Sequence, residues 1–304
     1  MSEFSDLTIY FNGDFIPWDE GRIHCFTPAV KYGAAVFEGI RGYWNDEQEK
    51  MYLFRLQEHM VRMEISQRIS RFGEVIPAQQ MCDATIELIR RNNFTGSVHI
   101  RPTVYVDGIG ESSARGPLGC FITAIQRGTA KSVETGVRAQ VSSWQRIADN
   151  MMPARAKANS NYGNARLAAV QAKQDGYDAA IFLNSRGKVS EGQAMCLFIV
   201  RDGKVVTPTI TSDILESITR DTVITLLHDQ GYEVQEREMD RSEFFLASEA
   251  FFCGSGAEIV PLINVDGEMI GKGEPGPVTR EIQTIYFDVA MGRVEDTRGW
   301  LTEV

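Results

Sequence analysis

The stretch from Pro153 to Lys173 constrains the fold and chemistry of this chain more than any other. Near its start, Lys157 stands between two alanines, and a polar, glycine-containing segment follows. From Ala165 the stretch is a run of strong helix formers with apolar residues on one face. This order predicts a lysine at or just before the start of a helix, with room to reach into a cleft. Arg155 lies two residues away, and a cationic, partly desolvated neighbourhood favours loss of the ammonium proton and a nucleophilic amine. The alternative is an ordinary surface lysine, which is typical of this residue type.

Length and charge narrow the class of protein. The chain has 304 residues, enough for two domains of ordinary size or one large one. Its formal net charge of -10 argues against a nucleic-acid-binding or membrane-surface protein, although a few arginines can still bind a small anion in one cleft. The acidic first residues lack the pattern of a signal peptide, and no apolar run reaches the roughly 20 residues that span a bilayer.

Cysteine and histidine usage points to a reduced compartment. The five cysteines are scattered without C-x-x-C spacing, and only four histidines are present. Such a composition offers neither a disulfide framework nor a zinc site. We therefore expect a cytoplasmic protein without a bound structural metal.

The first half of the chain mixes hairpins with helices. Residues 8–17 predict two strands joined by an Asn12-Gly13 turn, and residues 56–69 and 77–92 predict helices. Residues 97–106 predict a strand in which Pro102 implies an edge position or a bulge. Strands and helices do not alternate regularly, so the predicted fold class is α+β.

A polar stretch at residues 127–136 predicts an interdomain linker. It would separate a small α/β domain, residues 1–126, from a larger domain, residues 137–304. In the larger domain, residues 179–208 predict a meander of antiparallel strands, and residues 219–231 predict a helix that ends at a glycine.

Three features of the second half would complement a nucleophilic lysine. Thr219 begins a helix, whose free N–H groups can bind phosphate, although Thr219 could equally be a simple N-cap. The turn Gly254-Ser255-Gly256 could present its backbone to the same anion, or be an ordinary turn. Glu191, before Gly192, could accept a hydrogen bond from a protonated ring nitrogen, or be a solvated surface carboxylate. An amine, an anion-binding turn and a carboxylate are together what pyridoxal 5'-phosphate requires.

Several ordered motifs carry a resemblance to a known family over nearly the whole chain. The chain resembles the class IV aminotransferases of fold type IV, and within them the branched-chain amino acid aminotransferases. This resemblance implies two domains, one small and α/β, the other a larger pyridoxal-phosphate-binding domain with a mainly antiparallel, barrel-like core and flanking helices. The motifs are YGAAVFEGIR (32–41), FRLQEHMVRM (54–63), IRP (100–102), SSWQR (142–146), AKANSNY (156–162), VSEG (189–192), SITRD (217–221) and GSGAEI (254–259).

The resemblance also implies roles for individual residues. Lys157 would be the Schiff-base lysine and the proton shuttle, Glu191 would face the pyridine nitrogen, and Tyr162 would face the ring hydroxyl. The implied cofactor-binding set is Arg62, Lys157, Tyr162, Glu191, Leu215, Ile218, Thr219, Gly254 and Ser255. The implied substrate-binding set is Tyr32, Phe37, Gly39, Arg41, His99, Arg101, Arg127, Gly256 and Ala257.

The chain departs from the family pattern around the substrate pocket. His99 stands where a tyrosine is usual, Arg127 and Ala130 replace an aromatic pair, Ser255-Gly256 replaces threonine-alanine, and residues 108–115 replace a more hydrophobic loop. Because aromatic residues are replaced and an arginine is gained, we expect a substrate pocket that is less apolar than is usual in the family.

The implied reaction is ping-pong transamination between a branched-chain or other hydrophobic amino acid and 2-oxoglutarate, with Arg101 and Arg41 meeting substrate carboxylate. D-amino acid aminotransferases, (R)-selective amine transaminases and aminodeoxychorismate lyases are alternatives with the same fold. An alternative of a different class is a non-catalytic module that binds anions in an arginine-lined cleft. By resemblance we also expect a homodimer or higher oligomer, with amino and keto acids as its partners and no nucleic acid or membrane.

Overall fold

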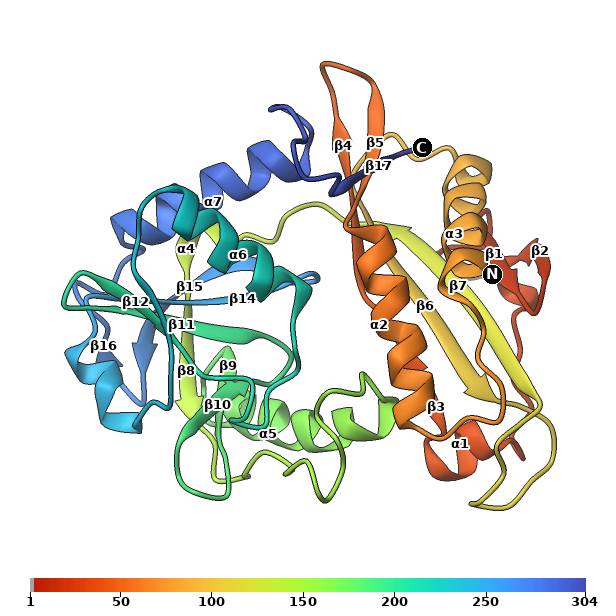
Figure 1. The fold of residues 1–304 in the computed structure, drawn as a ribbon, viewed down its shortest axis with the longest axis horizontal. Helices are drawn as coiled ribbons and strands as arrows, with labels where there is room; N and C mark the ends of the chain where they lie inside the picture. Colours follow the sequence, from red (N-terminus) through yellow and green to blue (C-terminus); the bar gives the residue numbers. More distant parts are fainter. Residues whose placement is uncertain (1–2) are drawn as a thin grey trace. The chain divides into compact units, whose positions relative to one another are not determined.

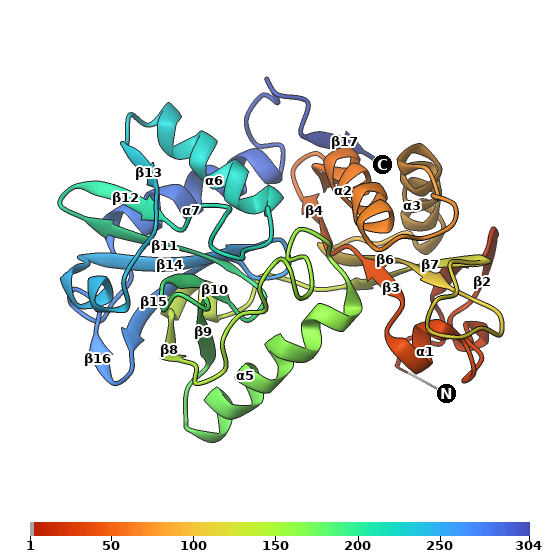
Figure 2. The ribbon, with the colours of Figure 1, turned by 60° about the horizontal axis from the view of Figure 1, so that its bottom comes forward.

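The computed structural model describes residues 3–304, and contacts divide the chain into two compact units (Figures 1 and 2). Of the described residues, the first unit contains 3–128, 156–160 and 288–304, and the second contains 129–155 and 161–287. The chain therefore returns to the first unit twice, once for the five residues around Lys157 and once at its C-terminus. The sequence-based domain boundaries remain a prediction, and they place neither of these returning segments in the first domain.

The first unit is built on one twisted sheet. Its strand order is β17-β5-β4-β6-β7-β1-β2, and β3 also pairs with β6. The C-terminal strand thus lies at one edge and the N-terminal hairpin at the other. The strands are β1 (Thr8–Phe11), β2 (Asp14–Pro17), β3 (Ala35–Phe37), β4 (Ile40–Asn45), β5 (Lys50–Phe54), β6 (Val98–Val106), β7 (Leu118–Gln126) and β17 (Leu301–Glu303).

Local chemistry explains two features of this sheet. Asn12 and Gly13 both have positive φ, 51° and 104°, as a tight two-residue hairpin turn requires, so the predicted hairpin is confirmed. The expected edge position of Pro102 is wrong, because β6 is a central strand. On one side β6 pairs with β4 through residues 98–100 and with β3 through residues 103–105. Pro102 falls between these two pairings, where no ladder hydrogen bond from its nitrogen is needed.

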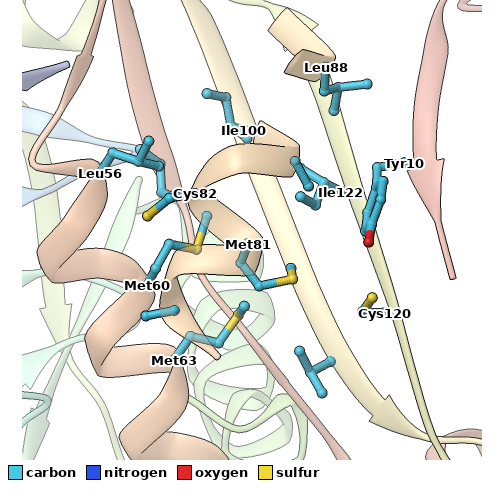
Figure 3. Packing of buried hydrophobic residues seen from close by; sticks show 14 of the residues in the cluster. Tyr10, Leu56, Met60, Met63, Met81, Cys82, Leu88, Ile100, Cys120 and Ile122 are labelled. Atoms are coloured by element: carbon cyan, nitrogen blue, oxygen red, sulfur yellow. The ribbon is translucent and has the colours of Figure 1, made fainter. Parts of the chain in front are cut away.

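Two helices pack against the sheet of the first unit through an apolar core rich in methionine (Figure 3). The helices are α2 (Leu56–Ile69) and α3 (Ala78–Asn92), both close to the sequence prediction, and the short α1 (Pro28–Tyr32) precedes β3. Met60, Met63 and Met81 are fully buried, and Ile100 and Ile122 of the sheet belong to the same core. Flexible methionine side chains fill the irregular space between helices and sheet.

The second unit contains a mixed sheet with the order β10-β9-β8-β15-β14-β11-β12-β13, and β16 pairs with β15. The hairpins β9–β10 and β11–β12 agree with the predicted meander, but β10 and β11 are not neighbours. Three pairs are parallel: β8 with β9, β8 with β15, and β12 with β13. The strands are β8 (Val137–Val141), β9 (Ala179–Leu183), β10 (Val189–Gly192), β11 (Cys196–Arg201), β12 (Lys204–Thr207), β13 (Val234–Glu236), β14 (Glu249–Gly254), β15 (Glu258–Val265) and β16 (Glu268–Met269).

Helical crossovers explain the parallel pairs of consecutive strands. The helix α5 (Tyr162–Gln174) connects β8 to β9, and α6 (Ile218–Asp229) connects β12 to β13. Parallel neighbours need a crossover of this kind, whereas a tight turn can only join antiparallel strands. The remaining helices are α4 (Ser132–Thr135), inside the predicted linker, and α7 (Pro277–Ala290), whose last three residues belong to the first unit. Across residues 3–304, no helix has both the length and the apolar character that spanning a membrane requires.

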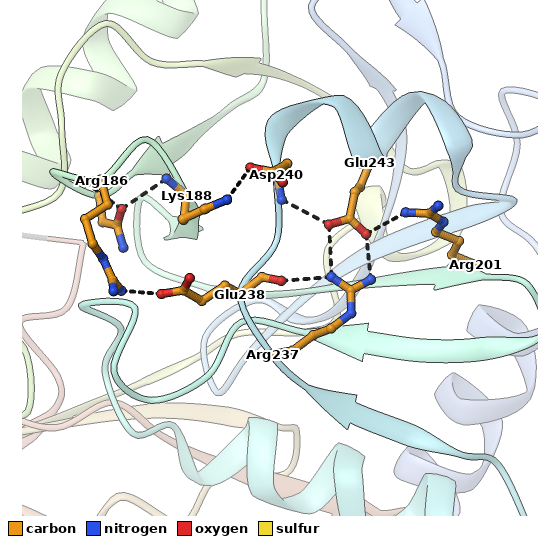
Figure 4. Close-up of polar contacts among 8 residues, drawn as sticks. Arg186, Lys188, Arg201, Arg237, Glu238, Asp240 and Glu243 are labelled. Atoms are coloured by element: carbon orange, nitrogen blue, oxygen red, sulfur yellow. Dashed lines mark hydrogen bonds and ion pairs between the residues drawn. The ribbon is translucent and has the colours of Figure 1, made fainter.

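A network of ion pairs consolidates one side of the second unit (Figure 4). The buried carboxylate of Glu243, in the 3₁₀ segment Arg241–Leu246, accepts two hydrogen bonds from Arg237, at 2.9 and 2.6 Å, and one from Arg201, at 2.9 Å. The Arg237 guanidinium, supported by the Asp240 amide and Arg201, lowers the pKa of Glu243 to about 2. This side of the unit is therefore stabilised by an ionised carboxylate.

Candidate active site

Lys157 is held by its backbone against the first unit. Its carbonyl accepts a hydrogen bond from the Phe37 amide at 3.0 Å, and its own amide donates to Ser66 Oγ at 3.1 Å. Ala158 forms an isolated β-bridge with Val36, and Ala156 and Ala158 are buried in the first core. The Lys157 side chain is only partly buried, with Nζ 5.0 Å from the centre of the Phe37 ring. The backbone of this lysine is therefore fixed, while the residue as a whole keeps partial exposure to solvent.

The polar stretch after Lys157 becomes helical earlier than the sequence predicts. A 3₁₀ turn spans Asn159–Asn161, and α5 starts at Tyr162 rather than at Ala165. Asn161 is buried and its Nδ2 donates to the Pro153 carbonyl at 3.1 Å. Tyr162 is half-buried and packs against the small apolar cluster of α5 and β9. The short side chains at the start of this segment permit a tight turn rather than an extended link.

Arg62, predicted to bind phosphate, forms part of a buried polar triad with Glu38 and His59. Both oxygens of Glu38 accept hydrogen bonds from Arg62, from Nε and Nη2 at 2.7 Å each, and His59 Nδ1 lies 2.7 Å from Oε2. Burial alone would raise the pKa of Glu38, but Arg62 and His59 hold it well below its usual range. Burial lowers the pKa of His59, so this imidazole is neutral at pH 7. The triad therefore contains one ion pair and one neutral ring.

The sequence prediction omitted Glu38 and His59. The sequence nevertheless contains one feature that points to each of these residues. Glu38 lies inside the FEG motif, and His59 precedes Arg62 by three residues, which places both on one face of α2. What the sequence does not show is that β3 and α2 pack so closely that a carboxylate at the end of β3 reaches both side chains.

Several residues predicted to bind substrate gather around His99 in the first unit. Arg41 of β4 pairs with His99 of β6 across the strands, and Arg101 follows two residues later on the same face. Arg41 Nη1 donates to the Arg127 carbonyl at 2.6 Å, and the Arg101 guanidinium lies 4.0 Å from the centre of the Phe37 ring. Burial, with Arg127, Arg41, Arg101 and Lys157 in that order, lowers the pKa of His99 to about 4. The face is therefore cationic around a neutral imidazole.

Other predicted substrate residues occupy different surroundings. Gly39 lies beside His99, since a Cβ there would be 3.4 Å from Nε2. Tyr32 is exposed at the end of α1, and its hydroxyl donates to Glu111 at 3.1 Å. Lys31 Nζ donates to the Gly110 carbonyl at 3.1 Å. These contacts attach the loop of residues 108–115 to α1.

The predicted phosphate-binding residues of the second unit meet at the start of α6. Ser217 is the N-cap of this helix, since its side chain accepts a hydrogen bond from the Arg220 amide. The alternative role of Thr219 as N-cap is therefore wrong. Thr219 is the second helical residue, is buried, and places Oγ1 3.1 Å from Ser255 Oγ. Two hydroxyl groups thus lie together beside a helix N-terminus, where the first amides have no carbonyl partner within the helix.

The turn after β14 brings Ser255 to this position. Ala257 N donates to the Gly254 carbonyl at 3.0 Å and closes a tight turn that contains Gly256. Gly254 is buried, whereas Gly256 is exposed.

Glu191 is buried, 5 % exposed, so the surface-carboxylate alternative is wrong. One of its oxygens pairs with Arg146 Nη2 at 2.8 Å, and the other accepts a hydrogen bond from the Leu215 amide at 3.2 Å. Leu215 therefore binds Glu191 through its backbone, three residues before α6 starts. The sequence prediction omitted Arg146, although it is the last residue of the SSWQR motif.

The residues of the two units suit the chemistry of pyridoxal 5'-phosphate. The first unit supplies a partly buried lysine beside an aromatic ring and an arginine fixed by Glu38. The second supplies paired hydroxyls at a helix N-terminus, which suit a phosphate, and a buried carboxylate, which suits a protonated ring nitrogen. The aldehyde, the phosphate and the ring nitrogen of the cofactor thus each have a matching type of side chain.

Comparisons with known proteins agree with this chemistry. Residues 35–265 match the family described as Amino-transferase class IV, and the chain belongs to this family. It is 40% identical to the branched-chain-amino-acid aminotransferase of Escherichia coli strain K12, over 97% of both chains. The branched-chain aminotransferase of Thermoproteus uzoniensis, solved with norvaline, superposes with a TM-score of 0.93, at 39% identity over 98% of this chain and 99% of that one. The holo form of the Thermobaculum terrenum enzyme, containing PLP, gives a TM-score of 0.91, at 44% identity over 97% of both chains.

Family membership confirms three predictions. The protein is an aminotransferase, its cofactor is pyridoxal 5'-phosphate, and its fold is the α+β fold of fold type IV. The alternative of a non-catalytic anion-binding module is therefore wrong.

Proposed function

We propose that this aminotransferase moves amino groups between branched-chain or related hydrophobic amino acids and 2-oxoglutarate, with Lys157 as the reactive amine. The observation that supports this most directly is the position of Lys157. Its backbone is fixed by Phe37 and Ser66, and the residue is only partly buried. The full-length similarity to enzymes named branched-chain-amino-acid aminotransferases supports the substrate class.

We propose the cofactor contacts from the resemblance to the family and from the chemistry of the side chains. Lys157 would supply the amine for the cofactor aldehyde, and Tyr162 would face the ring hydroxyl. Arg62, the hydroxyls of Thr219 and Ser255, and the first amides of α6 bind the phosphate. Glu191 accepts a hydrogen bond from the protonated ring nitrogen. When bound, the cofactor supplies an electron-withdrawing ring that makes a proton on the substrate α-carbon acidic.

The proposed catalytic step then depends on Lys157. With the cofactor bound, Lys157 Nζ would act as the base that accepts the proton from the substrate α-carbon and then as the acid that passes it on, and the same amine would reverse the transfer with the second substrate. Arg101, with Arg41, binds a substrate carboxylate and so orients the α-carbon toward this amine.

The cationic face around His99 favours substrates that carry a carboxylate. Burial, and after it the charges of Arg127, Arg41 and Arg101, lower the pKa of His99 to about 4. A plain amine would leave these charges without an anionic substrate group, so amino acids fit better than the substrates of (R)-selective amine transaminases. The same arginines make the site less suited to purely aliphatic side chains than an all-aromatic pocket.

A substrate panel tests this function. L-amino acids, D-amino acids and (R)-amines would each be assayed with 2-oxoglutarate and with pyruvate. We expect turnover of L-leucine, L-isoleucine and L-valine with 2-oxoglutarate, and little turnover of D-amino acids or amines. Faster turnover of D-alanine or an (R)-amine than of any L-amino acid would contradict the proposal.

We also propose that the enzyme is a cytoplasmic homodimer. The net charge of -10 and the free cysteines are consistent with a soluble protein in a reducing compartment. Sedimentation equilibrium of the purified holoenzyme tests the oligomer, with a monomeric mass as the contradicting result.

A further inference from the structure

Arg146 and Glu191 form an ion pair inside the second unit. Arg146 Nη2 lies 2.8 Å from Glu191 Oε1, and each side chain is only 7% exposed. Arg146 precedes α5 and Glu191 lies in β10, so the pair joins segments that are distant in sequence. A buried ion pair is by itself weak evidence of stabilisation, because the desolvation of the two charges can cost as much as their attraction returns.

The pair is also bonded to the segment that leads into α6. Arg146 Nε donates to the Asp213 carbonyl at 3.3 Å, and the Leu215 amide donates to Glu191 Oε2 at 3.2 Å. Asp213 has a φ of 61°, a conformation that non-glycine residues rarely adopt. The Leu215 carbonyl accepts a hydrogen bond from Cys196 Sγ at 3.7 Å. Segment 213–215 is therefore bonded to both members of the pair.

This arrangement fixes the orientation of the Glu191 carboxylate. A guanidinium on one oxygen and an amide on the other leave the carboxyl group little freedom to rotate. The backbone of Arg146 is itself held, since its amide donates to the Leu183 carbonyl at 2.9 Å.

The arginine also decides where a shared proton resides. A carboxylate and a pyridine nitrogen that share one proton can exist as an ion pair or as a neutral pair. Burial favours the neutral pair, in which the carboxyl group carries the proton. A permanent positive charge 2.8 Å from the carboxylate opposes this and keeps the proton on the nitrogen.

We infer that Arg146 is a positioning residue that keeps Glu191 ionised and correctly oriented, so that the proton it shares with the cofactor stays on the ring nitrogen. This inference rests on the proposed contact between Glu191 and that nitrogen. Arg146 acts only through Glu191 and takes no direct part in the reaction.

The test uses the holoenzyme loaded with pyridoxal 5'-phosphate that carries 15N at the ring nitrogen. The 15N chemical shift reports whether this nitrogen is protonated, and cofactor titration gives the dissociation constant. The variants are Arg146→Gln, which removes the charge, Arg146→Lys, which keeps it, and Glu191→Gln. Arg237→Gln is the matched control, because Arg237 is a structural arginine of the same unit that pairs with Glu243.

We expect Arg146→Gln to move the 15N shift toward that of an unprotonated nitrogen and to weaken cofactor binding about tenfold or more. Arg146→Lys should stay close to wild type in its 15N shift, because it retains the charge. Arg237→Gln should lower the melting temperature without changing the shift. If Arg146→Gln does not fold, Arg146→Met provides a neutral replacement of similar length.

Three results would overturn the inference. These are an unchanged 15N shift in the neutral variants, the same change in Arg146→Lys as in Arg146→Gln, and an equal change in Arg237→Gln. Glu191→Gln separates the inference from the proposed function. If Glu191→Gln leaves the shift unchanged, the proposed contact between Glu191 and the ring nitrogen is wrong as well. If Glu191→Gln moves the shift but the neutral Arg146 variants do not, only the role of Arg146 is wrong.

Discussion

Both oxygens of the Glu38 carboxylate are bonded to Arg62, at 2.7 Å from Nε and from Nη2. Glu38 is completely buried, and the side chain of Arg62 is 12% exposed. This two-point contact fixes the plane of the guanidinium, and the planar fork of arginine makes such a contact specific. An arginine proposed to bind phosphate is thus oriented before the phosphate arrives.

The first prediction concerns Glu38→Gln. Removing one charge leaves Arg62 buried without its counter-ion, so we expect a loss of about 3–5 kcal/mol in the free energy of unfolding. Binding of pyridoxal 5'-phosphate should also weaken. Urea unfolding of the apoprotein and cofactor titration measure the two effects.

The exposed pair Arg91–Glu87 on α3 offers a control for Glu38. Glu87→Gln removes a carboxylate from an arginine at the surface of the same unit, and should cost no more than about 0.5 kcal/mol. Equal losses in the free energy of unfolding for the two variants would contradict the prediction, because they would show that burial does not increase the cost of breaking the Glu38 pair.

The second prediction concerns Lys157→Ala. We expect a folded protein whose transaminase rate falls by roughly 10²- to 10⁴-fold or more, because no other amine replaces the proton shuttle. Treatment with borohydride and pyridoxal 5'-phosphate should attach no cofactor to this position, as mass spectrometry would show. Lys173→Ala, at the exposed end of α5, should behave as wild type. A Lys157→Ala protein that still turns over at the wild-type rate would refute the assignment.

The third prediction concerns how the stability of the second unit depends on pH in the acidic range. The pKa of Glu243 is about 2 in the folded protein and close to 4.5 when unfolded. A lowered folded pKa stabilises the protein above the unfolded pKa, and this stabilisation is lost as the pH falls from about 4.5 to about 2. The contribution at neutral pH is on the order of 3 kcal/mol.

Glu243→Gln tests this contribution. It should lower the stability at pH 7 and flatten the dependence of stability on pH between about 4.5 and about 2, measured by urea unfolding at several pH values. Glu233→Gln is the control, since Glu233 forms an exposed ion pair with Lys204. A pH profile of Glu243→Gln that matches wild type would contradict the prediction.

The fourth prediction concerns Arg127→Gln. Arg127 is exposed and acts electrostatically on the cationic face around His99. We expect kcat/KM for 2-oxoglutarate to fall roughly threefold to tenfold, and the value for L-leucine to change less, because only the dicarboxylate carries two negative charges. The difference between the two substrates in their loss of kcat/KM should become smaller at high salt, because salt screens exposed charges. Arg90→Gln, at the surface of α3, should change neither value, and equal losses for both substrates in Arg127→Gln would contradict the prediction.

Local sequence signals were enough for much of the fold. The hairpin at Asn12-Gly13 follows from turn chemistry, and α2 follows from apolar periodicity. Lys157, Thr219 and Glu191 become site candidates through the motifs AKANSNY, SITRD and VSEG, since each residue taken alone also fits an ordinary structural role. In contrast, the central place of β6 and the parallel pairs of the second sheet depend on which distant strands meet.

The partners of the candidate site residues likewise depend on which distant segments meet. The sequence by itself determined which side chains are candidates for the chemistry, because the ordered motifs that contain them resemble those of class IV aminotransferases. Only the tertiary structure decided that Arg62 is fixed by Glu38 and that Glu191 is paired with Arg146. The physical reason is that an ion pair between distant segments depends on how helices and strands pack, and packing is a property of the whole fold rather than of any short stretch.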